Sequence, residues 1–246
     1  MKLTWLGQHG LALEAAGRLL MVDPYLLDTM SETVGAEFGR CVPVDEAWTK
    51  VRPDMVLLTH DHIDHVDMPS LQAIVTDEKN VEMLCGANAW HKVRGQFPGD
   101  HNYIMMKPGS VWTSDTFRVR AIAARHSDET GVGYVIQAEG LTVVVSGDTL
   151  YFTDAAKEVG ENADIAVVVM NGKGNNMNCR DAAQYCADVH ARVAIPTHWG
   201  LFKKFANDPN TPECFAKEAA SLGVKAKKLQ IYETVDTKTL LEDYHG

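Results

Sequence analysis

The sequence has few cysteines and no Cys-x-x-Cys pair. The chain has five cysteines, so one thiol would stay unpaired in any complete disulfide scheme. They are Cys41, Cys85, Cys179, Cys186 and Cys214. A disulfide framework is therefore not expected, and this usage is typical of a reducing compartment. We expect most of these cysteines to serve as small apolar residues rather than as metal ligands.

Long apolar runs are also missing. No stretch approaches the roughly 18 apolar residues that a membrane-spanning helix needs. The chain begins with an amphipathic run at residues 2–6, without the charged, apolar and small-residue segments of a signal peptide. Its 246 residues are 46% hydrophobic, and no linker or repeat divides them. We therefore predict a single domain over residues 1–246 that is cytoplasmic and has no membrane partner.

Positive charge is scarce. The chain has 23 Lys and Arg residues against 33 Asp and Glu residues, which gives a net charge of −10. Proteins that bind nucleic acids neutralise phosphates with dense Lys and Arg, and the only short basic block here lies at residues 225–228. We therefore expect no nucleic-acid partner. A small anionic substrate stays compatible with this balance, because local charges dominate inside a pocket.

Histidine and aspartate, by contrast, are concentrated in one place. Residues 60–65 read His-Asp-His-Ile-Asp-His, and they come after the apolar run at residues 55–58. Imidazole and carboxylate groups are the side chains that hold zinc, manganese or iron in proteins. The alternative is a solvated polar loop. The density of the cluster favours a metal site at the end of a strand.

Three later residues stand in the same kind of position. His126, Asp148 and His198 each follow a β-branched or apolar run that is typical of a buried strand. Either histidine alone would more often be an ordinary structural residue. Taken with the first cluster, they indicate that four strands converge on one site, because strand ends present chemistry to solvent.

This pattern resembles the metallo-β-lactamase superfamily, whose signature is His-x-His-x-Asp-His followed by a single His, a single Asp and a final His. The resemblance runs over residues 3–206. It implies one metal held by His60, His62 and His126, a second held by Asp64, His65 and His198, and Asp148 as a bridge between them. Within the superfamily, residues 4–10, 22–25, 59–62 and 171–177 look most like the L-ascorbate-6-phosphate lactonase group.

The strand and helix pattern agrees with that resemblance. Predicted strands cover residues 2–6, 18–22, 55–58, 81–85, 117–122, 134–138, 141–145, 165–170 and 192–195. Predicted helices cover residues 69–76, 87–94, 154–159, 180–189 and 212–222. The residues 138–140 are typical of a hairpin turn. Hairpins mixed with βα units predict an α/β fold, a four-layer αββα sandwich of two mixed sheets flanked by helices.

The ligand types indicate how such a site would work. Two divalent ions, zinc or manganese with iron also compatible, would lower the pKa of a shared water toward neutrality and so supply a bridging hydroxide. Asp148 is the expected bridge. Asp64 is expected to be a ligand that also passes a proton to the leaving group, as the resemblance implies. Asp61 is expected to orient a ligand imidazole, with a structural cap as the alternative.

Substrate contacts are predicted from a Gly- and Asn-rich loop at residues 171–176 and from the region that follows His198. Glycine allows close approach to a ligand, and amide, cationic and aromatic side chains can bind a small polar molecule. The candidates are Lys173, Asn175, Asn176, Arg180, Trp199 and Lys203. An ordinary turn, ordinary packing and solvated lysines explain the same residues. The segment 27–44 is a candidate lid, and His9 is not assigned.

These features favour a metal-dependent hydrolase that is lactonase-like. We expect it to open a lactone or related C–O ester bond in a small polar molecule, a phosphorylated one included. One alternative is a phosphodiesterase or thioesterase on the same fold. The other is not hydrolytic, and it is either a di-iron redox protein or a metal-stabilised binding module. A homo-oligomer is compatible with the sequence.

Overall fold

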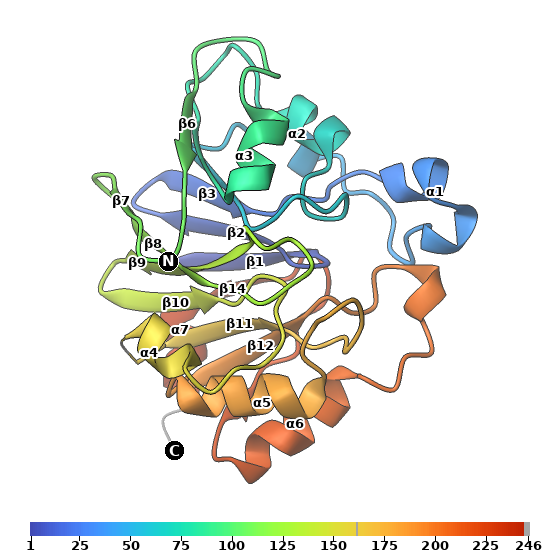
Figure 1. The fold of residues 1–246 in the computed structure, drawn as a ribbon, viewed down its shortest axis with the longest axis vertical. Coiled ribbons are helices and arrows are strands. Elements are labelled where there is room, and N and C mark those ends of the chain that lie inside the picture. Colours follow the sequence, from blue (N-terminus) through green and yellow to red (C-terminus); the bar gives the residue numbers. More distant parts are fainter. Residues whose placement is uncertain (161, 244–246) are drawn as a thin grey trace.

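Two seven-stranded β-sheets pack face to face in the computed structural model, which describes residues 1–160 and 162–243 (Figure 1). The first sheet has the strand order β14-β1-β2-β3-β4-β5-β6. Its strands are β1 (Lys2–Gly7), β2 (Gly10–Ala15), β3 (Arg18–Val22), β4 (Met55–Leu58), β5 (Glu82–Cys85), β6 (Asn102–Met105) and β14 (Thr234–Asp236).

The second sheet has the order β13-β12-β11-β10-β9-β8-β7. Its strands are β7 (Val111–Thr113), β8 (Arg118–Ala123), β9 (Val132–Ala138), β10 (Leu141–Val145), β11 (Ile165–Val169), β12 (Val193–Thr197) and β13 (Lys225–Ala226). Both sheets are mixed in the same way. In the first sheet the pairings from β14 to β3 are antiparallel and those from β3 to β6 are parallel. In the second sheet the pairings from β7 to β10 are antiparallel and those from β10 to β13 are parallel.

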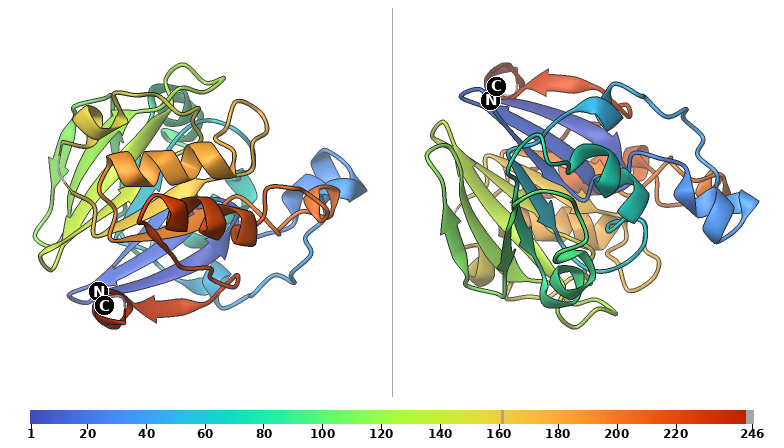
Figure 2. Two further views of the ribbon diagram at one scale, coloured as in Figure 1. Left: turned by 90° about the horizontal axis from the view of Figure 1, so that it is seen from below. Right: turned by 90° about the horizontal axis from the view of Figure 1, so that it is seen from above.

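Helices cover the outer face of each sheet (Figure 2). The first sheet carries α2 (Met68–Ile74) and α3 (Ala87–Val93), and the second carries α4 (Ala155–Val159), α5 (Cys179–Asp188) and α6 (Pro212–Ser221). The short elements are α1 (Thr29–Thr33), α7 (Thr237–Glu242) and the 3-10 turns η1 (Ala36–Phe38), η2 (Trp48–Lys50) and η3 (Lys203–Phe205). The predicted α/β fold of two mixed sheets flanked by helices is confirmed.

The central strands are apolar on both faces, which explains their continuous hydrophobic sequences. In β10, Val143 and Val145 point into the core between the sheets, whereas Val144 packs with the helices on the outer side. In β11, Val167 likewise points into the core between the sheets, and Val168 packs with the helices on the outer side. Parallel strands covered on both sides lack the usual alternation of apolar and polar residues. These strands were therefore predictable as buried runs.

The nine predicted strands and five predicted helices are all present, with ends displaced by at most two residues. The predicted hairpin lies between β9 and β10, where Glu139 and Gly140 have φ values of 52° and 77°. A two-residue hairpin turn of this kind requires positive φ at both positions. The sequence prediction missed β2, β6, β7, β13, β14, α1 and α7. Most of these are short, and pairing or packing with distant segments forms them.

All five cysteines are free thiols, in line with the absence of a predicted disulfide framework. None of the helices in the described ranges combines the length and the apolar content that crossing a bilayer requires.

A small lobe projects from the sandwich beside the carboxyl ends of the strands (Figure 2). It joins α1 and η1 to η3, and Met30, Phe38, Phe202 and Phe205 belong to its own apolar cluster. Arg40 lies beneath it, where its guanidinium donates to the carbonyl of Tyr25 and to the hydroxyl of Tyr232. The predicted lid segment 27–44 is thus a packed lobe.

Candidate metal centre

All seven predicted ligands lie together at one end of the sandwich. Their donor atoms form three overlapping groups, in each of which the atoms lie within 4.8 Å of one another. The groups are His60, His62 and His126, then His60, His65 and Asp148, then Asp64, His65 and His198. The first and third groups match the two predicted metal sites, and Asp148 lies with one imidazole from each.

Backbone geometry brings the ligands into this arrangement. After β4 the chain turns tightly, and the amide of Val66 donates to the carbonyl of His62 at 2.7 Å. After β10, Gly147 adopts a φ of 63°, and a Cβ atom there would lie 2.6 Å from the carbonyl oxygen of Val132. Only glycine tolerates both conditions. This turn places Asp148 against the histidines that follow β4, with its Oδ2 3.5 Å from His65 Nε2.

Several polar atoms of the cluster are buried and lack a hydrogen-bond partner. Among the described residues these include His60 Nε2, His65 Nε2 and Asp148 Oδ1. A buried polar atom without a partner costs about 1–3 kcal/mol, so native structures rarely leave three together. Divalent cations bound among these residues would satisfy all three atoms. The donor set of imidazoles and carboxylates suits zinc, manganese or iron, so the residues present fit a metal.

The charges within the cluster oppose one another. Burial would raise the pKa of Asp148, but the adjacent His198 and His65 hold it well below its usual range. Burial would lower the pKa of His198, yet Asp148 and Asp64 raise it to about 9. Burial lowers the pKa of His60 well below its usual range. Without metal, His198 therefore carries a proton near pH 7 that a metal ion must displace, and binding becomes pH-dependent.

Asp23 orients two of the imidazoles from behind. It is fully buried after β3, and its Oδ2 accepts from His65 Nδ1 at 2.8 Å and from the Thr59 hydroxyl at 2.6 Å. The same Thr59 oxygen lies 3.0 Å from His60 Nδ1. These contacts leave the Nε2 atoms of both histidines facing the site, as ligand imidazoles require. The sequence analysis did not find this role, although residues 22–25 carried part of the resemblance.

Asp61, which was predicted to orient an imidazole, takes part through its backbone instead. Its amide donates to Asp128 at 3.1 Å, and its carbonyl accepts from Lys92 Nζ at 2.8 Å. Asp128 is itself held by the side-chain amide of Asn88. Asp61 therefore secures the loop that carries the ligands, and Asp23 occupies the orienting position.

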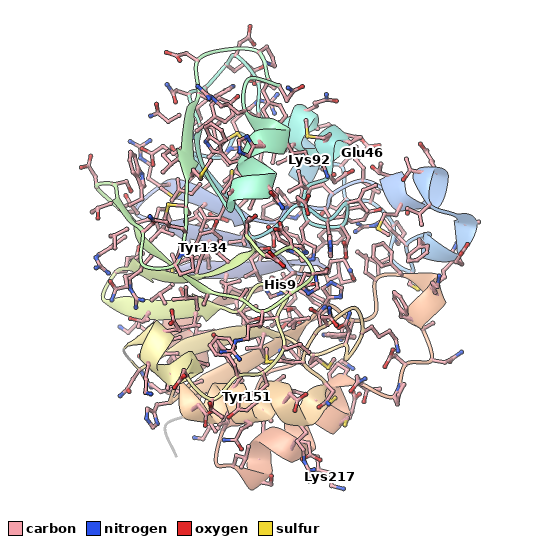
Figure 3. All side chains as sticks on the ribbon, viewed as in Figure 1. His9, Glu46, Lys92, Tyr134, Tyr151 and Lys217 are labelled. Carbon is pink, nitrogen blue, oxygen red and sulfur yellow. The ribbon has the colours of Figure 1, made fainter. Side chains whose placement is uncertain are left out.

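His9 lies in the turn between β1 and β2 and is fully buried (Figure 3). Its Nε2 accepts from the amide of Gly147 at 3.1 Å, and its Nδ1 lies 2.7 Å from the hydroxyl of Thr197. Since an amide can only donate, Nδ1 carries the proton and donates to Thr197, whose hydroxyl donates to the carbonyl of Val168. Burial lowers the pKa of His9 to about 4, so it is neutral at pH 7. His9 thus ties together the loops that carry Asp148 and His198.

Gln8, the neighbour of His9, lies nearer the ligands. Its side-chain amide donates to Asp64 Oδ2 at 2.9 Å, and its backbone carbonyl accepts from the backbone amide of His198 at 2.8 Å. One turn of the first sheet therefore holds a ligand that follows β4 and a ligand that follows β12. The sequence analysis could not assign this turn, because its contacts cross between the sheets.

The loop at residues 171–176, predicted to bind substrate, makes three contacts with ligands. Asn171 Nδ2 lies 2.8 Å from His198 Nδ1, and Asn176 Nδ2 donates to Asp148 Oδ2 at 2.8 Å. The carbonyl oxygen of Asn175 lies 3.2 Å from His126 Nδ1. Asn171 and Asn176 also line the cavity over the cluster. The loop therefore supports the ligands as well as forming part of the cavity wall.

The other predicted substrate contacts lie in different places. Lys173 lines the cavity but pairs with Asp208 at 2.6 Å. The Arg180 side chain is 84% exposed and lies 3.9 Å from Glu218 on the outer side of α5. Trp199 stacks on Trp5 and lines a second, adjoining cavity of about 220 Å³. Lys203 is exposed on η3 and is not part of either cavity wall.

The cavity over the ligands holds about 270 Å³. One wall consists of the metal-ligand candidates and the amides described above. The opposite wall comes from the lobe and consists of Met30, Phe38, Phe202 and Phe205. The arrangement can therefore hold a small molecule between a charged, polar wall and an apolar one.

Comparison with known proteins agrees with this geometry. The family described as Beta-lactamase superfamily domain matches residues 24–199. A UPF0173 metal-dependent hydrolase from Nitratidesulfovibrio vulgaris strain Hildenborough is 30% identical over 209 residues, which covers 82% of this chain and 81% of that protein. Another from Methanopyrus kandleri is 28% identical over 236 residues, covering 91% and 94%.

Solved structures resemble the fold as a whole. A metallo hydrolase from Ignicoccus hospitalis has a TM-score of 0.74 at 19% identity, and covers 95% of this chain and 97% of its own. The metallo-beta-lactamase fold protein YhfI from Bacillus subtilis has a TM-score of 0.67 at 18% identity, covering 96% and 99%. At these identities the likeness concerns the fold.

Proposed function

This chain belongs to the family described as Beta-lactamase superfamily domain and is a metal-dependent hydrolase, and we propose that it opens a lactone or related C–O ester bond in a small molecule. The reaction would use two divalent ions held by the seven clustered candidate ligands. Zinc or manganese suits these ligands best. The observation that carries the proposal is the trio of buried, unpartnered atoms His60 Nε2, His65 Nε2 and Asp148 Oδ1, which face one another.

The chain's own residues have separate tasks in this proposal. His60, His62 and His126 would hold one ion, Asp64, His65 and His198 would hold the other, and Asp148 would contact both. When bound, the ions would supply a hydroxide nucleophile near neutral pH and polarise the carbonyl oxygen of an ester.

Asp64 is the residue best placed to handle a proton during the reaction. Its carboxylate borders the cavity, accepts from Gln8 Nε2 at 2.9 Å and lies 3.3 Å from His198 Nε2. The nearby imidazoles hold the pKa of Asp64 well below its usual range despite burial, so its carboxylate is ionised. In this proposal Asp64 would take the proton of the attacking hydroxide and donate it to the leaving alkoxide as the ring C–O bond breaks, which completes ring opening.

Two measurements test the proposal. Elemental analysis of protein purified without added metal should show about two equivalents of zinc or manganese per chain. The metal-loaded protein should then open simple γ- and δ-lactones faster than phosphodiester or thioester probes. The control is Asp54→Asn, which alters a carboxylate remote from the cavity. A protein that takes up no metal on reconstitution, or one loaded with metal that cleaves only the other probes, would contradict the proposal.

A further inference from the structure

We infer that the wall opposite the metal ligands selects a neutral substrate with an apolar or aromatic group beside the cleaved bond, in preference to a phosphorylated substrate. This inference rests on the proposed function, because it names the substrate class of the same site. Three observations carry it, namely an aromatic wall, a neutralised lysine and an unpaired acceptor on Asn176.

The aromatic wall is built by the lobe and lines the same cavity as the candidate ligands. Phe38 makes edge-to-face contacts with Phe202 and Phe205, each with ring centroids 6.0 Å apart. Met30 completes this wall and is 6% exposed. Aromatic rings held by their neighbours offer a rigid apolar surface at little cost in side-chain entropy. Such a surface stabilises a ring or alkyl group and leaves a phosphate without hydrogen-bond donors.

Lys173 is the one Lys or Arg residue in the described wall of this cavity. Its Nζ lies 2.6 Å from Asp208 Oδ2, and it also lies 5.8 Å from the centre of the Phe205 ring. The Asp208 side chain is 10% exposed and is held by the amide of Asn210. Binding a phosphate would require Lys173 to leave a largely buried carboxylate without its partner, which is costly. Lys173 is therefore engaged within the wall.

Asn176 presents an unpaired acceptor next to the bridging carboxylate. Its Nδ2 donates to Asp148 Oδ2 at 2.8 Å, and because a carboxylate can only accept, this contact settles which way the amide points. Its Oδ1 is buried and has no hydrogen-bond partner among the described residues. The residue is 7% exposed and lines the cavity. A substrate with a hydroxyl or amide N–H near the cleaved bond would satisfy this oxygen.

The test compares three γ-butyrolactones that differ in one ring substituent: a phenyl, a methyl or a phosphoryloxymethyl group. We expect the metal-loaded protein to open the phenyl lactone with a kcat/KM at least about tenfold above that of the phosphorylated lactone, because burial of an aromatic ring is worth roughly that factor or more. A phosphorylated lactone that is opened equally fast or faster would overturn the inference.

Two variants identify the cause of the preference. Phe205→Ala should raise KM for the phenyl lactone about tenfold and leave the methyl lactone within about twofold, since only the larger group reaches the aromatic wall. Lys173→Met should leave two ratios of kcat/KM unchanged, namely that of the phenyl to the methyl lactone and that of the phenyl to the phosphorylated lactone. Val34→Ala is the matched control, because Val34 is 49% exposed on the lobe and does not line the cavity. If Lys173→Met selectively impairs the phosphorylated lactone and Phe205→Ala is silent, the inference is wrong.

Failure of the proposed function can be told apart from failure of this inference. If no lactone is opened, calorimetric titration of the metal-loaded protein with the three corresponding ring-opened hydroxy acids still measures which substituent is bound. Tighter binding of the phenyl acid, weakened by Phe205→Ala, would support the inference without turnover. Equal or tighter binding of the phosphorylated acid would overturn it.

Discussion

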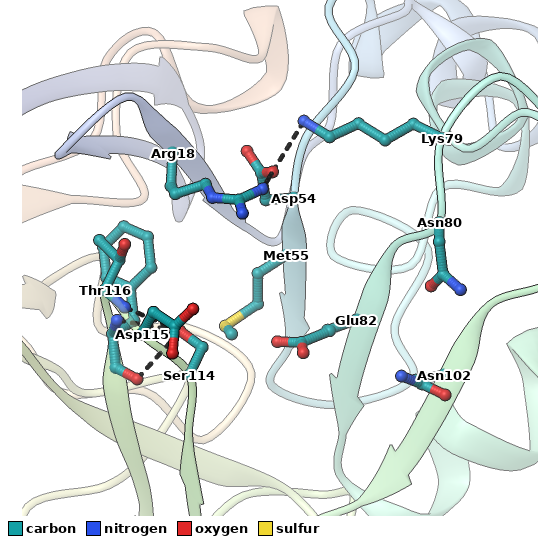
Figure 4. Close-up of a pocket in the computed structure, with 11 residues that line it drawn as sticks. Arg18, Asp54, Met55, Lys79, Asn80, Glu82, Asn102, Ser114, Asp115 and Thr116 are labelled. Carbon is teal, nitrogen blue, oxygen red and sulfur yellow. Dashed lines mark hydrogen bonds and ion pairs between the residues drawn. The ribbon is translucent and has the colours of Figure 1, made fainter.

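The two ends of the β-sandwich both carry a charged hollow, and they differ in how their charges are satisfied. The end remote from the metal centre has the larger one, about 510 Å³, beside the start of β4 and β5 and the turn between β7 and β8 (Figure 4). There Asp54 pairs with Arg18 at 2.6 Å and with Lys79 at 2.9 Å. Glu82 accepts from the Trp112 indole. Both cations of this hollow are thus paired with a carboxylate in the same wall.

At the metal centre the smaller cavity contains buried groups that the protein does not satisfy by itself. His60, His65 and Asp148 are each at most 5% exposed, whereas Arg18 in the remote hollow is 57% exposed. Exposed ion pairs contribute roughly 0–1 kcal/mol, while unpaired buried polar atoms are costly and persist where they have a purpose. Of these two cavities, the larger is therefore not the one that contains the unsatisfied buried groups.

The largest expected effect follows from removing the carboxylate of Asp148, the proposed bridge between the two ions. Asp148→Ala should abolish binding of at least one metal equivalent and lower lactone hydrolysis by more than about a thousandfold, because no nucleophile would then be generated near pH 7. Elemental analysis and initial rates measure the two effects on the same preparation. Retention of full metal content together with full activity would erase the proposed difference between the two ends.

A smaller loss is expected from Asp23→Asn. This substitution keeps the size of the side chain but weakens its contacts with His65 and Thr59. Loss of a group that orients ligand imidazoles typically lowers metal affinity about 10–100-fold. Competition with a chromogenic chelator measures that affinity, and circular dichroism checks the fold. An unchanged affinity would show that Asp23 contributes to folding alone.

His9 should affect the pH dependence of stability in the metal-free protein. Its pKa falls from 6.5 to about 4 on folding, so the unfolded chain binds more protons between these values. Its stabilising contribution is present above pH 6.5 and is lost as the pH falls toward about 4. His9→Asn should therefore flatten the change in urea midpoint across this range relative to the unaltered protein. Parallel curves for the two proteins would contradict this account.

The smallest effect is expected at the remote hollow. Asp54→Asn should lower the free energy of unfolding by about 1 kcal/mol or less and leave metal content and activity unchanged, since its two ion pairs are partly exposed. Hydrogen bonds from Leu19, Lys79 and Arg18 hold the pKa of Asp54 below 3.8 in spite of burial. Its contribution is therefore present at neutral pH and is lost in acid. A marked loss of activity would place function at this end as well.

Much of the fold and the ligand set could be predicted because the evidence is local. His60, His62, Asp64 and His65 lie within six residues of one another, and each later candidate ligand stands one to three residues after the end of a strand. The strands β4, β10 and β11 are long enough and apolar enough to be identified from periodicity alone. By contrast, β13 has two residues and exists because it pairs with β12. Such elements carry little signal of their own.

The groups that orient the ligands were not predictable in the same way. Asp23 contacts His65 from 42 positions away, and His9 contacts Gly147 from 138 positions away. No local pattern in the sequence links these pairs. The lysine in the cavity wall illustrates the same limit, because its pairing with Asp208 is visible only once the chain has folded.

The sequence by itself determined which residues are candidate ligands, which predicted strands they follow and how apolar the sheets are. These properties depend on residue type and on short spacings in the chain. Only the tertiary structure decided which atoms are buried without partners, which carboxylate orients the imidazoles and which cation is neutralised. Those properties depend on distances between segments far apart in the chain, and desolvation and charge pairing change steeply over a few ångströms.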